Sequence, residues 1–384
     1  MILSPVPKPF KRLWRVGSEI QFFQRLLEVN WLYVTLVTLL AMTGYIALYS
    51  AAGGASHPFA QPQALRFCFG LVLMTLIALS PLKILYRTAG LFYCVSILLL
   101  VMVLAMGHVG KGAERWINLL GFQFQPSEFA KIALVIGLAS FFANPAIKNL
   151  RSSLKWIFPS LMVLLPVLLV LKEPNLGTAV IIGVIGASIF FCAGFPLWII
   201  GTAGAVLPFL GEFLYNHLHD YQKARIDTFL HPEHDRLGAG YNILQSKIAL
   251  GSGGFWGKGY LHGTQGQLNF LPEKQTDFIF TMIGEEWGYV GALSIIILLA
   301  LVTAAGMIMG IFCKNSFSRL LCLGIAMDFF LYCAVNLAMV MGAIPVGGVP
   351  LPLISYGGSA MLTMMVGFGV LLCAWRHRFE KEIT

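Results

Sequence analysis

The chain contains 384 residues, of which 58% are hydrophobic and only 11% are charged, with a formal net charge of +9. A soluble domain needs far more charge on its surface than this. Several apolar runs are also long enough to cross the hydrocarbon core of a bilayer, roughly 30 Å thick. The composition therefore excludes an ordinary soluble protein and predicts an all-α polytopic membrane protein.

The basic, mixed segment at residues 1–30 does not resemble a cleavable signal peptide, and we expect it to be a cytoplasmic tail. Ten apolar runs, bounded by Gly, Pro and charged residues, follow it. The predicted spans are 31–51, 64–80, 88–107, 127–143, 155–172, 176–193, 196–215, 278–311, 319–341 and 354–375. They form a single membrane domain over residues 31–375, which includes a loop at 216–277 and leaves residues 376–384 as a C-terminal tail.

Lys and Arg gather on one face of this arrangement. They are frequent in the N-terminal tail and in the segments "SPLKILYRT", "NPAIKNLRSSLK", "CKNSFSR" and "WRHRFEKEIT". The positive-inside rule places this face, with both termini, in the cytoplasm, so the loop at 216–277 is periplasmic. The same bias explains most of the net charge, and we therefore expect no nucleic-acid binding.

Two polar segments precede the fourth span on the outer face. "GKGAERW" offers Lys111 and Arg115 for a phosphate group and Trp116 for stacking on a sugar, although a solvated loop with an interfacial Trp accounts for the same residues. In "QPSEFAK", Glu128 and Lys131 lie three residues apart on one helical face. A local ion pair explains them, but a lysine in an apolar helix needs a partner or a cavity.

The eighth span is too long for the membrane alone. A continuous helix from Asp277 to Ile311 would measure roughly 52 Å, about 20 Å more than the bilayer core. Its first turns are predicted to stand among the headgroups or to line a cavity, with Thr276 as N-cap. Gly284 and Gly288 share a helical face with Asp277 and leave room for another backbone or a ligand. Asp277 is either a helix-start residue or a functional acid.

The long outer loop gives few chemical signals. Its residues Tyr241–Leu250 are predicted to form a short amphipathic helix on the membrane. The following glycines do not match a P-loop, because Ser252 and Gly259 stand at required motif positions. "HPEHD" lacks a third metal ligand, and the cysteines form no disulfide framework. Asp328, inside the ninth span, is expected to find a partner within the bundle.

Motifs along most of the chain, roughly residues 30–378, resemble the SEDS family of bacterial cell-wall proteins (shape, elongation, division and sporulation). In family order, they are "GKGAERWI", "FQPSEFAK", "KEPNLGTA", "GAGYNILQSKIALGSGGFWGKG", "GTQ", "FLPEKQTDFIF", "GEEWGYVG" and "GVPLPLISYGG". The residues of the motifs "GVPLP" and "KEPNLGT" favour the elongation branch of the family over the division branch. Gln275 stands where the family often has His, and Asn175 replaces an acid.

The resemblance implies a ten-helix glycosyltransferase that polymerises lipid II into peptidoglycan strands on the outer face of the cytoplasmic membrane, during elongation and rod-shape maintenance. It also implies work with a class B penicillin-binding protein and other elongation-complex proteins. The family's essential acid falls on Asp277, and its paired acid and base fall on Glu128 and Lys131. We expect no cofactor; a divalent cation that assists the leaving group stays open.

For this reaction, Asp277 is the expected general base for a sugar hydroxyl, and cations are expected to hold the diphosphates. The predicted cations are Lys111, Arg115, Lys131, Arg225, Lys258 and Lys274. Glu128 would orient Lys131, and Trp116 would contact sugar or lipid. Two alternatives stay open: a lipid II flippase, which predicts discontinuous helices and polar residues at the midplane, and a non-catalytic scaffold for the penicillin-binding protein, which would leave the outer acids without a role.

Overall fold

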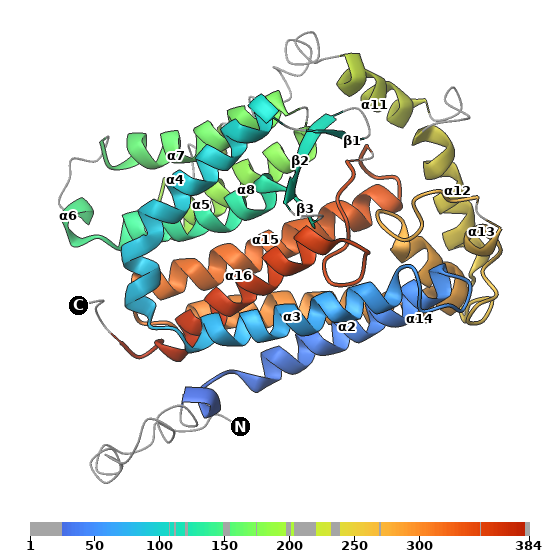
Figure 1. The fold of residues 1–384 in the computed structure, drawn as a ribbon, viewed down its shortest axis with the longest axis horizontal. Coiled ribbons are helices and arrows are strands. Elements are labelled where there is room, and N and C mark those ends of the chain that lie inside the picture. Colours follow the sequence, from blue (N-terminus) through green and yellow to red (C-terminus); the bar gives the residue numbers. More distant parts are fainter. Residues whose placement is uncertain are drawn as a thin grey trace.

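The computed structural model describes residues 25–106, 108–110, 113–119, 122–148, 154–173, 175–196, 201–202, 220–231, 239–268, 270–345 and 347–380. Its long helices lie side by side along one axis (Figure 1). Three short strands and the helices of the long outer loop gather at one end of this bundle (Figure 1). Residues near both ends of the described chain, such as Arg25 and Glu380, line one cavity and therefore lie together.

Eight helices in the described ranges are long and apolar enough to span a membrane. They are α2 (Trp31–Ala51), α3 (Ala60–Leu79), α4 (Leu82–Met106), α5 (Pro126–Ala143), α7 (Leu154–Lys172), α14 (Ile279–Ile311), α15 (Ser316–Val340) and α16 (Gly358–Arg376). The apolar helix α8 (Leu176–Cys192) has 17 residues, and α6 (Pro145–Lys148) is a single turn. These helices confirm the polytopic all-α fold and match nine of the predicted spans. The predicted span at 196–215 lies almost wholly outside the described residues.

The outer segment between α4 and α5 forms a small sheet that the sequence did not predict. Strands β1 (His108–Gly110), β2 (Ala113–Leu119) and β3 (Phe122–Phe124) pair in that order and antiparallel. Consecutive short strands joined by tight connections pair in this way because each supplies the backbone partners of the next. The sheet stands at the outer end of the bundle, beside the loop that precedes α16 (Figure 1).

The outer loop contains α11 (Asp220–Leu230), α12 (Ala239–Ser252) and α13 (Thr264–Gln267). Helix α12 confirms the predicted amphipathic helix, and its buried face packs on the bundle. The Ser246 hydroxyl lies 2.8 Å from the Thr281 hydroxyl and donates to the carbonyl of Val340 at 2.8 Å. The opposite face exposes Leu244 and Ile248. A helix of this kind covers the bundle while it presents apolar side chains outward.

Helix α14 is not the continuous helix that we predicted. It begins at Ile279 after the N-cap residue Phe278, so Asp277 lies outside the helix and Thr276 is not its cap. The Thr276 hydroxyl instead donates to the Glu273 carboxylate at 3.0 Å. Further along, Gly288 has φ 67° and ψ −162°, which interrupts the helix. Only glycine adopts such a conformation without steric cost.

The glycine-rich segment after α12 fills this interruption. On one side of Gly288, the carbonyls of Glu285 and Glu286 accept hydrogen bonds of 3.0 Å from the N–H groups of Lys258 and Gly259. On the other side, the N–H groups of Tyr289 and Val290 donate to the carbonyls of Gly254 (2.9 Å) and Phe255 (3.2 Å). The backbone groups that the break frees are thus satisfied by protein, as the membrane setting demands.

The two backbones approach so closely at the break that only glycine fits at the contact positions. A Cβ atom at Gly288 would lie 2.2 Å from the backbone nitrogen of Gly257, and one at Gly253 would lie 2.1 Å from the carbonyl oxygen of Gly284. Of the two predicted alternatives, another backbone or a ligand, the structure confirms another backbone at Gly288. At Gly284 the space is instead taken by the Leu250 side chain, whose Cδ2 atom lies 2.4 Å from the position of a Cβ atom.

The substitution Gly288→Ala is therefore expected to destabilise the protein. A left-handed conformation costs a non-glycine residue roughly 1–2 kcal/mol, and the added methyl group also collides with the glycine-rich segment. The thermal unfolding midpoint of the purified protein in detergent should fall by several degrees. Gly183→Ala in α8 is the control, because nothing lies within 4 Å of its Cβ position. An unchanged midpoint for Gly288→Ala would show that the segment and the helix are not locked together.

Candidate functional site

Asp277 is fixed through its backbone by a buried side chain of α15. The amide of Asn336 donates to the carbonyl of Asp277 at 2.9 Å and to the carbonyl of Val349 at 2.7 Å. The Asn336 side chain is fully buried, whereas Asp277 is partly exposed. One amide thus joins the segment before α14 to the loop before α16, and it leaves the Asp277 carboxylate outside this pair of bonds.

A second connection runs beside the first. The Ser355 hydroxyl donates to the Thr276 carbonyl at 2.6 Å and accepts from the Leu351 N–H at 2.8 Å. The Tyr356 N–H donates to the Gln275 carbonyl at 2.8 Å. Residues 275–277 are therefore held along the loop at 349–356 by consecutive hydrogen bonds. We call this arrangement the strap, meaning residues 275–277 together with 349–356.

Gly348, which directly precedes the second part of the strap, lies close to the Asp277 carboxylate. A Cβ atom at Gly348 would lie 3.8 Å from Asp277 Oδ2, so this carboxylate oxygen lies near the Gly348 backbone. Gly348 has φ 67°, a left-handed conformation that favours glycine. The backbone of the loop before α16 therefore turns at Gly348, close to the acid.

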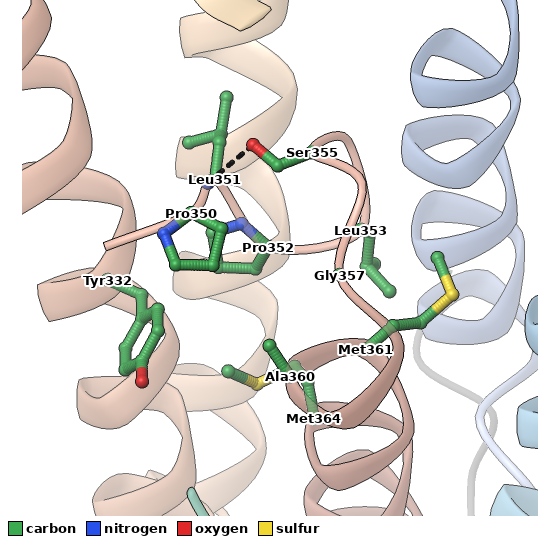
Figure 2. Close-up of a pocket in the computed structure, with 10 residues that line it drawn as sticks. All are labelled: Tyr332, Pro350, Leu351, Pro352, Leu353, Ser355, Gly357, Ala360, Met361 and Met364. Carbon is green, nitrogen blue, oxygen red and sulfur yellow. Dashed lines mark hydrogen bonds between the residues drawn. The ribbon is translucent and has the colours of Figure 1, made fainter. Parts of the chain in front are cut away.

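The floor beneath the strap is tightly packed. Figure 2 shows Pro350 and Pro352 above Tyr332 of α15, with Ala360 and Met364 of α16 beside them. The cavity that they line measures only about 10 Å³, close to the minimum that holds one water molecule. A ligand larger than water therefore cannot reach Asp277 through this floor.

An open hollow lies beside the strap. It has a volume of about 460 Å³ and is lined by Ala51, Ala52, Gly53, Phe59, Gln267, Pro272, Lys274 and Gln275. Gln275 belongs to the strap, two residues before Asp277. The Lys274 ammonium donates to the Gly266 carbonyl at 2.7 Å. Partial burial lowers the pKa of Lys274, because desolvation disfavours its charged form, and an anion in the hollow would oppose this shift.

The predicted pair Glu128 and Lys131 belongs to a buried network in the bundle. The Lys131 Nζ atom lies 3.1 Å from Glu128 Oε2 and 3.7 Å from Asp328 Oδ1. It also sits 3.5 Å from the centre of the Tyr332 ring, and the Tyr332 hydroxyl donates to Glu128. Lys131 is 1% exposed. The ion pair is thus present, and Asp328 has the expected partner in Lys131; a diphosphate would reach Lys131 only if this network opened.

Lys258 is also paired with a carboxylate. Its Nζ atom lies 2.7 Å from Glu285 Oε1 and 2.8 Å from the Thr264 hydroxyl. The N–H of Gln265 donates to the same Glu285 oxygen at 3.0 Å, and the neighbouring Glu286 accepts from the Ser50 hydroxyl. Glu285 and Glu286 are both buried. These two acids therefore anchor the outer loop to the bundle and are not exposed interfacial charges.

The other predicted residues are placed less fully. Lys111 lies outside the described residues, and so does the side chain of Arg115. Trp116 is half-buried on β2, opposite His108 of β1. Arg225 lies on α11, which packs on α12. Of the predicted cations, Lys274 lies three residues before Asp277 on the same outer segment, and it lines the open hollow.

Sequence reasoning missed Asn336 and Ser355, the two side chains that hold the strap. A polar side chain inside an apolar span is itself a signal, since it must find a partner there. Asn336 gave that signal in the ninth predicted span. Ser355 stood in "LISYGG", where a hydroxyl two residues before a pair of glycines is equally typical of an ordinary turn.

Comparison with known proteins gives a consistent picture. A family model for FtsW, RodA and SpoVE, described as "Cell cycle protein", matches residues 28–380. The peptidoglycan glycosyltransferase MrdB of Escherichia coli K12 is 42% identical over 352 residues, which cover 89% of this chain and 93% of that protein. The probable peptidoglycan glycosyltransferase FtsW of Trichlorobacter lovleyi is 37% identical over 361 residues, which cover 91% and 93%.

Solved structures resemble the chain over nearly its whole length. A chain of a peptidoglycan synthase complex that coordinates polymerization and crosslinking matches with a TM-score of 0.78 and 29% identity, over 92% of this chain and 99% of that one. The rod shape determining protein RodA of Thermus thermophilus matches with a TM-score of 0.70 and 27% identity, over 92% and 98%. The chain therefore belongs to the FtsW, RodA and SpoVE family, the SEDS family that its sequence motifs resemble.

Proposed function

We propose that this membrane protein is a peptidoglycan glycosyltransferase that polymerises lipid II into glycan strands for cell elongation and rod-shape maintenance, with Asp277 as its general base. The observation that carries the proposal is the position of Asp277. The residue is partly exposed, while two buried side chains, Asn336 and Ser355, fix the strap on which it stands. A catalytic base must be held in this way, because small displacements of a reacting group cost large factors in rate.

The proposed reaction needs one base and one leaving group. Asp277 accepts the proton of the sugar 4-hydroxyl while that oxygen forms a bond to the anomeric carbon of the second sugar. The bond between the anomeric carbon and the diphosphate breaks, and its electron pair leaves with the lipid diphosphate. A single displacement of this kind inverts an α-linked sugar to a β-linked strand without a covalent intermediate on the enzyme.

The diphosphate gains negative charge as it leaves, and fixed cations stabilise that charge. Lys274 is the predicted cation that best supports this role, because it lines the open hollow beside the strap. Glu128 and Lys131 support the reaction from within the bundle, where Lys131 packs on Tyr332 under the strap. We assign no cofactor; a divalent cation at the diphosphate is compatible with the same chemistry.

Two features are also expected of a flippase: the break in α14 and the charged network around Lys131. In a transporter, broken half-helices leave their ends free to bind substrate. Here the freed backbone groups at Gly288 are occupied by the glycine-rich segment, and the Lys131 charge is paired with buried carboxylates. Both features therefore fit a fixed framework, which supports the polymerase.

The setting follows from the same proposal. We place the strap on the outer face of the cytoplasmic membrane, where lipid-linked sugars meet the headgroup layer. The similarity to a chain of a peptidoglycan synthase complex supports a class B penicillin-binding protein as partner, with other elongation-complex proteins around it.

The substitution Asp277→Asn is expected to lower strand synthesis by about 10²–10⁴-fold, the range that general-base catalysis contributes. The measurement is the length and amount of strands on a gel, made by the purified chain with its penicillin-binding partner and lipid II. Asp227→Asn, which makes the same change at an exposed position of α11, is the control. Normal strand synthesis by Asp277→Asn would remove the assigned base, and transport of lipid II by a wild-type protein that never lengthens strands would favour the flippase.

The substitution Asn336→Ala is expected to lower kcat by about ten- to a hundredfold with little change in KM, because the strap loses its fixed position while substrate contacts remain. Asn315→Ala is the control. Asn315 caps the opposite end of the same helix by accepting from the Phe317 N–H at 2.8 Å. Its loss should lower the thermal midpoint comparably and leave kcat unchanged. Equal losses of kcat in both variants would reduce Asn336 to a purely structural residue.

A further inference from the structure

Arg66 of α3 is a cation beside the strap that none of the assignments above uses. One guanidinium nitrogen, Nη2, donates to the Tyr356 hydroxyl at 3.2 Å, and the guanidinium carbon lies 4.8 Å from the Tyr356 ring centre. The other terminal nitrogen, Nη1, is buried and has no hydrogen-bond partner among the described residues. A buried donor on a charged group without a partner is costly, so such a group calls for a ligand.

Within the described ranges, the charge of Arg66 also lacks a counter-charge at ion-pair distance. Lys131 and Lys258 each have a carboxylate within 4.0 Å, whereas no carboxylate among the described residues forms an ion pair with Arg66. A partly buried guanidinium without an acid is rare, because burial disfavours an unbalanced charge. An anion from outside the chain would supply what the protein does not.

A second electropositive feature lies against Arg66. The guanidinium rests on Gly358, the first residue of α16: a Cβ atom there would lie 3.2 Å from Nε and 3.3 Å from Cζ. The N-cap residue Gly357 provides no side-chain hydrogen bond to this helix end. The amino-terminal end of a helix is positive and carries unsatisfied N–H groups. Two positive groups in contact favour an anion between them.

Gln63 adds an acceptor one turn away on the same helix. Its side chain is 2% exposed, and its amide nitrogen donates to the Ser355 carbonyl at 2.8 Å. Its amide oxygen is buried and finds no hydrogen-bond partner in the part of the chain that the structure describes. A ligand that satisfies both Arg66 and Gln63 must therefore offer acceptor oxygens together with a hydroxyl or N–H donor. A phosphate ester of a sugar has this combination.

From these contacts we infer that Arg66, Gln63 and the amino-terminal end of α16 form a phosphate-binding subsite for the diphosphate of a lipid-linked saccharide. The ligand's identity rests on the proposed function, while its phosphate chemistry rests on the contacts alone. The subsite adjoins the proposed base, because Tyr356 both contacts Arg66 and donates its N–H to Gln275, two residues before Asp277. A diphosphate held there would lie at the strap that carries the acid.

The experiment measures equilibrium binding of fluorescent lipid II to the full chain in detergent. Arg66→Gln should weaken binding by about ten- to a hundredfold, the loss typical of a charged hydrogen-bonding contact. Arg66→Lys should fall in between, because an ammonium keeps the charge but lacks the guanidinium fork. Arg87→Gln, at an exposed position on α4, removes the same charge elsewhere and should bind as wild type. Thermal midpoints verify that each variant is folded.

Competition identifies the source of the phosphate. Unlabelled lipid II should displace the probe from wild type far better than phosphatidylglycerol or inorganic diphosphate, and this preference should shrink in Arg66→Gln. Wild-type affinity in Arg66→Gln overturns the subsite, and equal displacement by phosphatidylglycerol overturns its assignment to a lipid-linked saccharide. Failure of the proposed function is distinguishable, because Asp277→Asn should bind lipid II normally: strand synthesis by Asp277→Asn together with weak binding by Arg66→Gln would keep the subsite and remove only the base.

Discussion

Backbone that is not helical can exist at the end of a membrane bundle only if protein groups accept and donate its hydrogen bonds. The strap and the break in α14 both meet this demand, by different means. Asn336 and Ser355 supply side-chain bonds to carbonyls at the strap. A glycine-rich backbone supplies them at Gly288, where no side chain would fit. The outer end of the bundle is therefore rigid although it is irregular, and rigidity is what a positioned acid requires.

The charges inside the bundle obey a related rule. Glu128, Lys131 and Asp328 are each nearly inaccessible to water, and an isolated charge at that depth would be strongly unfavourable. Their mutual contacts, with the Tyr332 ring against the ammonium, offset part of that penalty. Tyr332 also lines the packed floor beneath the strap. The network is thus in physical contact with the support of Asp277, which links a buried ion pair to an acid on the outer segment without any direct bond between them.

The apolar spans were largely predictable because length and hydropathy report directly on a membrane crossing. The 31–51 prediction matches α2 residue for residue. Errors arose where tertiary contacts override local pattern. Helical periodicity predicted a continuous eighth span through Gly288. The break there was missed because the glycine-rich segment that fills it is distant in sequence. Thr276 was a reasonable cap by residue type. In the structure, however, its carbonyl accepts a hydrogen bond from Ser355 and its hydroxyl donates to Glu273.

Predicting the site was harder for a similar reason. Sequence identifies which residues carry charge but not which of them the fold neutralises. Lys131 stood three residues from an acid and Lys258 in a glycine-rich motif without acids, and the structure pairs them with Glu128 and Glu285. Arg66 stood in an unremarkable apolar run, and the structure leaves one of its nitrogens buried and unsatisfied beside a helix terminus. Among the described residues, Arg376 also has a buried guanidinium nitrogen without a hydrogen-bond partner, but Arg66 is the arginine that contacts the strap. Its place beside the candidate base is what a substrate would explain. The unsatisfied guanidinium of Arg66, rather than the cations that are already paired with acids, therefore indicates where an anionic ligand binds.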